Sequence, residues 1–176
     1  MRRRVLLPAM LAMALSPGGV QAQQQAHKFT IGILNPPGAS GVPPALVAGL
    51  RELGYQVDGN LAFVVRSART SNTELVDLAE ELVRAMPDLL VASGTPPSLA
   101  LKQATTAIPI VVVNVGNPVA TGLVQSLARP GGNVTGTANA VEDWRGKSLQ
   151  MVNEFLPGLR CLAFLRNAAN ASIMSS

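Results

Sequence analysis

The chain has 176 residues, of which 48% are apolar and 14% charged, and its formal net charge is +4. Arg2, Arg3 and Arg4 supply three of the positive charges, so the sequence from residue 23 onward carries only +1. With no basic stripe, one Trp and one Tyr, the sequence excludes a nucleic-acid-binding protein that works by phosphate contacts and base stacking.

Residues 1–22 have the three parts of a secretory signal peptide. The arginines precede an apolar run over residues 5–15, and small residues lead up to Ala22. The run is shorter than the roughly 20 apolar residues of a membrane-spanning helix, which disfavours a membrane anchor. We therefore expect cleavage after Ala22 and a soluble periplasmic protein.

The next part of the chain predicts two strand–helix units. Apolar runs predict strands at residues 29–34 and 61–65, and Pro43-Pro44 opens a helix that ends at Gly54. Ser71 and Glu74 have the spacing of a capping box, in which Ser71 accepts from the Glu74 N–H, and Pro87 ends the second helix. The apolar face of the first helix comprises Leu46, Leu50 and Leu53, and that of the second Leu75, Leu78, Ala79, Leu82, Val83 and Met86.

The same alternation continues to the end of the chain. The run over residues 110–115 is so uniformly branched and apolar that we expect both faces of this strand to be covered at the centre of the sheet. Cys161 lies in an apolar run and is expected to be a small buried hydrophobe. The remaining predicted strands are at residues 89–92, 134–137 and 161–165, and the remaining helices at 95–106, 119–128 and 141–156.

This order of elements predicts an α/β fold with a doubly wound parallel sheet. Residues 23–176 are long enough for one compact domain with a single core but not for a second full lobe. We expect residues 23–140 to form the first lobe and residues 141–176 to begin the second.

Polar turns follow three of the predicted strands. We predict Thr95 to be the N-cap of a helix with Pro96 at its first position, and Gly116 to allow a ligand or the backbone to come close. Thr95 as a cap alone and as a cap with a ligand remain equally open. Because carboxyl ends of parallel strands share an edge, where ligands bind, the turns converge on one candidate site. Its predicted ligand-binding residues are Asn35, Ser93, Gly94, Thr95, Pro96, Asn114, Gly116 and Asn117.

The search for catalytic motifs is negative. His27 is the single histidine and follows the expected cleavage site, so a nucleophilic triad would have no base. The sequence contains neither of the glycine-rich nucleotide-binding motifs, G-x-G-x-x-G after a strand and G-x-x-x-x-G-K-[ST]. It also has no cluster of His, Cys or acidic residues with the spacing of metal ligands. We therefore expect neither an enzyme nor a bound cofactor or metal.

The motifs around these turns resemble a known family. The sequence Leu-Ala-Arg-Pro-Gly-Gly-Asn-Val-Thr-Gly at residues 127–136, with those at 50–55, 93–96, 108–111 and 116–119, resembles the substrate-binding proteins of ABC importers, in the group typified by tryptophan and tyrosine binders. The resemblance covers residues 28–170. It implies a Rossmann-like or flavodoxin-like lobe of a type I periplasmic binding protein, a small polar ligand such as an amino acid, and a membrane permease as partner.

Two departures from the family bear on function. Asn117 stands where the family usually has an aspartate, so a charged contact with a ligand amine would be replaced by a neutral hydrogen bond. The resemblance also implies a second lobe, of which residues 141–176 are expected to be only the start. Exposed apolar surface there would favour dimerisation, and the alternative to a binding protein is a non-binding remnant or interaction module of the same fold.

Overall fold

The computed structural model describes residues 28–139, 141–163 and 170, and its central feature is a five-stranded parallel sheet. The strand order is β2-β1-β3-β4-β5, which confirms the predicted α/β fold. The expected signal peptide lies outside the described residues. The strands are β1 (Phe29–Asn35), β2 (Leu61–Ser67), β3 (Leu89–Ser93), β4 (Ile110–Gly116) and β5 (Val134–Asn139).

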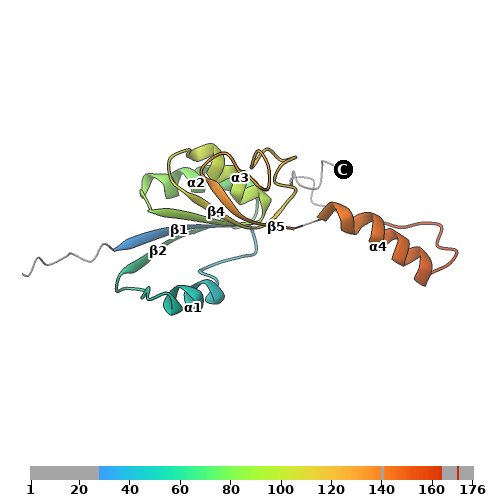
Figure 1. Cartoon of the computed structure of the whole chain (residues 1–176), viewed down its shortest axis with the longest axis horizontal. Helices are drawn as coiled ribbons and strands as arrows, with labels where there is room; N and C mark the ends of the chain where they lie inside the picture. The colour runs from blue at the N-terminus through green and yellow to red at the C-terminus, as the bar shows by residue number, and fades with distance from the viewer. Residues whose placement is uncertain (1–27, 140, 164–169, 171–176) are drawn as a thin grey trace, which may run out of the picture.

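Helices cover both faces of this sheet. In Figure 1, α2 and α3 lie above the sheet and α1 lies below it. A 3₁₀ turn, η1 (Asn72–Glu74), leads into α2. The helices are α1 (Pro44–Glu52), α2 (Leu75–Arg84), α3 (Thr95–Ala104) and α4 (Val141–Phe155).

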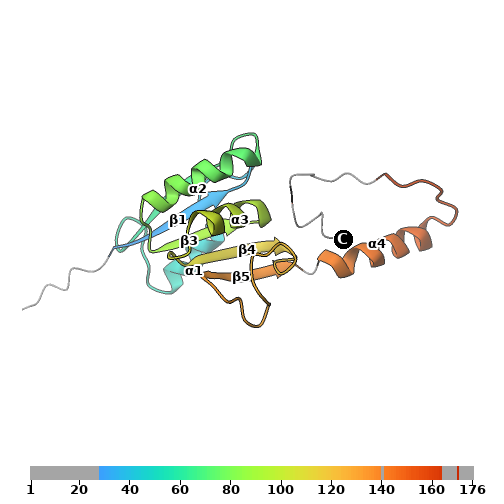
Figure 2. The same cartoon turned by 90° about the horizontal axis from the view of Figure 1, so that it is seen from above.

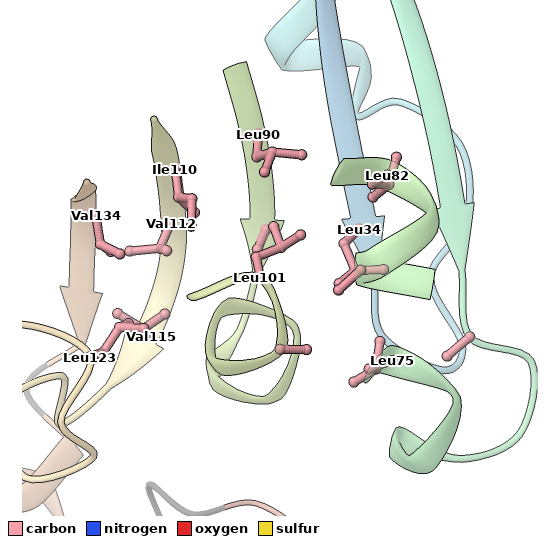
Figure 3. Packing of buried hydrophobic residues seen from close by; sticks show 14 residues of the cluster. Leu34, Leu75, Leu82, Leu90, Leu101, Ile110, Val112, Val115, Leu123 and Val134 are labelled. Atoms are coloured by element: carbon pink, nitrogen blue, oxygen red, sulfur yellow. The ribbon is translucent and has the colours of Figure 1, made fainter. Parts of the chain in front are cut away.

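The main core lies between the sheet and the pair α2 and α3. Because successive strand residues point to opposite faces, Leu34, Leu90 and Ile110 meet the leucines of these two helices on one side (Figure 3). A smaller cluster on the other face, under α1, contains Ile31 and Ile33. The remaining buried residues of the main cluster are Ala68, Leu75, Ala79, Leu82, Ala92, Ala100, Leu101, Val112, Val115, Leu123 and Val134.

The helix predicted at residues 119–128 is wrong, since the chain there forms successive turns. Gly122 has φ of 69°, which interrupts helical geometry, and the Leu123 and Val124 N–H groups both donate to the Pro118 carbonyl. This path brings Leu123 into the main core, where it is fully buried. Leu123 is therefore buried by a turn and not by the predicted helix.

The predicted position of β4 is also wrong. The middle strand is β3, and β4 lies one place nearer the edge. Val112 and Val115 are buried against the main cluster, but Val113 is 43% exposed. A uniformly apolar strand thus has only one well-covered face here, because the α1 cluster is centred on β1, β2 and β3.

Several residues predicted to be buried lie at the surface. Leu53 and Met86 are exposed because α1 ends at Glu52 and α2 at Arg84, one or two residues before them. Cys161 is exposed too, and residues 161–163 form no strand; the rest of that predicted strand lies outside the described residues.

The last helix stands away from the rest of the structure. Figures 1 and 2 show α4 apart from the sheet, beyond the ends of β4 and β5. Phe155 is 78% exposed, so the side of the helix that carries it packs against no described element. The other large apolar side chains exposed in this part of the chain are Leu149, Met151, Leu156, Leu159 and Leu162.

A β-bulge distorts the pairing of β4 with β5. Val112 pairs with Gly136 and Val115 with Ala138, so β4 has one more residue than β5 between these points. Gly136 has φ of 144°, and a Cβ atom there would lie 1.9 Å from the Val112 carbonyl oxygen. The bulge therefore requires a glycine on the partner strand.

We expect Gly136→Ala to lower the free energy of unfolding by about 3 kcal/mol, because the methyl group would force the two strands apart. Urea denaturation measures the change. Gly49→Ala is the matched control: no atom lies near that Cβ position in α1, and the change should stabilise the protein by up to about 1 kcal/mol. Equal effects of the two substitutions would contradict the close approach at Gly136.

The predicted capping box forms, and it lies at the start of the 3₁₀ turn η1. The Ser71 hydroxyl oxygen accepts from the Thr73 N–H at 3.1 Å, and the Glu74 carboxylate accepts from the Ser71 N–H at 3.3 Å. Glu74 also accepts from the N–H groups of Arg69 and Thr70 and from the Thr70 hydroxyl. These bonds, chiefly the one from the Arg69 N–H, lower the pKa of Glu74 from 4.5 to about 2.

Glu74→Gln should reveal this pKa as a pH dependence of stability. A carboxylate whose folded pKa is depressed stabilises the fold above its unfolded value, and the stabilisation is lost as pH falls through the folded pKa. The difference in unfolding free energy between wild type and Glu74→Gln should therefore be constant above about pH 5 and shrink towards about pH 2. An NMR titration of Glu74 with a midpoint near 4.5 would contradict the proposed bonding.

Candidate ligand-binding site

The predicted site residues all lie at one edge of the sheet. Asn35, Ser93 and Gly116 are the last residues of β1, β3 and β4, and parallel strands end on the same side. The register pairs Ser93 with Val113, so β4 continues for three residues beyond β3. The edge is therefore stepped, with the end of β4 projecting past its neighbour.

Thr95 connects the start of α3 to the projecting end of β4. The predicted N-cap role is wrong, because Gly94 (φ of 84°) is the N-cap of α3 and Thr95 is its first residue. The Thr95 hydroxyl instead accepts a hydrogen bond from the Gly116 N–H at 3.1 Å, and the residue is only 2% exposed. Thr95 thus fixes the end of β4 against the start of α3.

Ser98 completes the α3 start. Its hydroxyl donates to the Gly94 carbonyl at 2.7 Å, and the Gly94 N–H donates to the Val113 carbonyl at 2.8 Å. The turn between β3 and α3 is consequently held from both sides. Ser93, Gly94 and Pro96 remain half-buried, so part of each is accessible from solvent.

Asn35 is also engaged within the protein. It is 4% exposed, and its Nδ2 donates to the Gly41 carbonyl at 2.9 Å and to the Ser67 hydroxyl at 3.2 Å. The side chain therefore ties the loop after β1 to the end of β2. In this structure, Asn35 and Thr95 shape the edge, and more accessible groups form its surface.

Asn117 begins the turn after β4. It adopts φ of 40°, a left-handed conformation that asparagine tolerates better than most residues. Its Oδ1 accepts from the Ala120 N–H at 3.1 Å, and its carbonyl accepts from the Thr121 hydroxyl at 3.0 Å. The residue is half-buried at the same edge as Gly116.

Asn114 extends the edge towards β5. It is exposed at the bulge with φ of 61°, and its N–H donates to the Thr137 hydroxyl. The Asn139 side chain donates to Asn114 Oδ1. Sequence analysis missed Thr137 and Asn139, because an exposed edge strand gives no apolar signal and the bulge that turns Asn114 towards them has no motif of its own.

The edge is lined by neutral polar groups. The residues placed there carry amides or hydroxyls or are glycine or proline, with no ionisable side chain among them. Within residues 28–139, 141–163 and 170, no cluster of His, Cys, Asp or Glu could hold a metal ion. The arrangement can therefore donate and accept hydrogen bonds, whereas these residues supply no group suited to proton transfer.

The solved structures with the same fold are longer chains. A conserved domain protein from Vibrio cholerae O1 biovar El Tor superposes with a TM-score of 0.70 at 30% identity, covering 84% of this chain and 50% of that chain. An ABC domain from Streptococcus pneumonia, solved in complex with L-Trp, gives a TM-score of 0.55 at 28% identity and covers 63% of this chain and 38% of that chain. The described sheet and helices are thus part of a type I periplasmic binding protein fold.

The sequence matches identify the family. A tyrosine-binding protein from Clostridioides difficile (strain R20291) is 30% identical over 126 residues, which are 72% of this chain and 36% of that protein. The family described as ABC transporter substrate binding protein matches residues 31–175, and the chain belongs to it. The chain spans half or less of the length of each of these relatives. No helix in the described part of the chain is long and apolar enough to cross a bilayer.

Thr95→Val tests the bond that joins β4 to α3. Valine has nearly the shape of threonine but no acceptor, so the buried Gly116 N–H would lose its partner at a cost of about 1–3 kcal/mol in unfolding free energy. Thr95→Ser, which keeps the hydroxyl, should retain most of the stability. Hydrogen exchange at the Gly116 amide should be faster in the valine variant and unchanged in the serine variant. Unchanged exchange at Gly116 in the valine variant would contradict the bond to Thr95.

Proposed function

We propose that this chain is the amino-terminal lobe of the periplasmic solute-binding component of an ABC importer. Its ligand is an amino acid or a similar small polar metabolite. The observation that carries the proposal is the gathering of polar groups from three adjacent strands at one sheet edge, the position at which open α/β sheets bind ligands. The L-Trp named for the Streptococcus pneumonia structure and the tyrosine named for the Clostridioides difficile protein favour an aromatic amino acid.

The proposal divides the predicted residues by their accessibility. Ser93, Gly94, Pro96, Asn114 and Asn117 provide the surface that meets the ligand. The buried Asn35 and Thr95, together with the backbone of Gly116, hold these groups in place. Ligand recognition by this lobe thus relies on neutral hydrogen bonds.

Residues 141–176 begin the second lobe in this proposal, and export by the signal peptide at residues 1–22 delivers the protein to the periplasm, where a membrane permease is its partner. The exposed apolar side chains on and after α4 suit packing against the second half of such a protein. The same side chains are the reason to expect dimerisation of this chain by itself.

A single lobe buries much less of a ligand than a closed two-lobed cleft. We therefore expect weak binding, with Kd for L-tryptophan or L-tyrosine of about 1 mM, which corresponds to roughly 4 kcal/mol. Chemical-shift titration of the backbone amides at residues 93–96 and 114–117 measures this affinity. A non-binding remnant would give no shifts at these positions for any amino acid.

Asn117→Asp should tighten binding of amino acids. A carboxylate accepts a stronger hydrogen bond from a ligand ammonium than an amide does, so we expect Kd for L-tryptophan to fall by about five-fold. Indole-3-propionate has the same ring and carboxylate without the ammonium, and its affinity should stay the same or fall. Asn153→Asp on the exposed side of α4 is the matched control and should change neither Kd. Equal changes for both ligands would refute contact between Asn117 and the amine.

A further inference from the structure

Lys102 contacts the turn that follows β4. It lies in the last turn of α3, and its Nζ donates to the Gly122 carbonyl at 2.5 Å and to the Leu123 carbonyl at 3.0 Å. Lys102 forms no ion pair with a described carboxylate. Its charge is instead directed at two successive backbone carbonyls.

These two carbonyls are accessible because residues 119–128 do not form the predicted helix. In a helix, each would accept from an N–H four residues further on. Here the positive φ of Gly122 turns the chain, and Leu123 enters the core. Leu123 is buried, so its carbonyl without a donor would destabilise this turn, whereas Gly122 is exposed; the ammonium group supplies donors to both carbonyls.

Helix α3 therefore holds the segment after β4 at two points. At its start, the Thr95 hydroxyl accepts from the Gly116 N–H, and in its last turn Lys102 binds the carbonyls of residues 122 and 123. Asn117 lies between the two points, and its Oδ1 accepts from the Ala120 N–H while its carbonyl accepts from the Thr121 hydroxyl. The distance of Asn117 from the sheet edge thus depends on both anchors.

We propose that Lys102 is a positioning residue for ligand binding, which acts by holding the turn at residues 117–123 against α3. It does not touch the ligand. The inference rests on the proposed function for its ligand, but the order of the turn is a property of the protein without ligand. The two can therefore be measured separately.

Lys102→Met keeps the aliphatic stem and removes the ammonium. Because the ammonium group donates to both carbonyls, its removal should accelerate amide exchange at Leu123 and Val124 by about ten-fold or more, while exchange in β1 and β3 stays unchanged. Affinity for L-tryptophan should fall by several-fold. Lys147→Met, on the exposed side of α4, is the matched control and should alter neither quantity.

The double variant Lys102→Met, Asn117→Asp separates positioning from general stability. If Lys102 places Asn117, the gain in affinity produced by Asn117→Asp should largely disappear in the Lys102→Met background. An undiminished gain there, or unchanged exchange at Leu123 and Val124, would overturn the proposal. If exchange is faster in Lys102→Met but wild type binds no amino acid, the proposed function is refuted. Lys102 would then hold the turn in place without any role in ligand binding.

Discussion

The candidate site depends on one buried hydrogen bond, from the Gly116 N–H to the Thr95 hydroxyl. Parallel pairing brings the carboxyl ends of all five strands to one edge, but it does not fix how far each strand extends. The bond from Gly116 holds the end of β4, which continues beyond the last residue of β3, against the start of α3. The exposed Asn114 and the half-buried Asn117 flank this point, so this bond helps to place both amides.

The strands were predictable because a strand buried in a parallel sheet is a continuous apolar run. The predicted strands at residues 29–34, 61–65 and 89–92 differ from β1, β2 and β3 by no more than two residues at either end. The helix at residues 119–128 was not predictable in the same way. In the structure, turns bury Leu123 fully and pack Val124 partly against the core, and the sequence carries no motif for this path.

The sequence predicted the position of the candidate site better than it predicted the hydrogen-bonding roles of the residues there. Any polar turn after a parallel strand reaches the same edge, so the grouping of Asn35, Thr95 and Asn117 required only the correct fold. Their hydrogen-bond partners required the tertiary structure. Thr95 looks like an N-cap beside Pro96, yet the left-handed conformation of Gly94 moves the cap back by one residue and leaves the Thr95 hydroxyl to bind β4.

Under the proposed function, folding and ligand binding depend on different parts of this chain. Both buried clusters are built from residues between Ile31 and Val134, and no α4 side chain that the structure describes belongs to either. The lobe consequently has a core of its own, and the exposed apolar side chains on and after α4 add nothing to it. Closure over the proposed ligand would, by contrast, need a surface opposite the sheet edge, on the side where α4 lies in Figure 2. Changes that remove such a surface would therefore weaken ligand binding while leaving the stability of the described sheet intact.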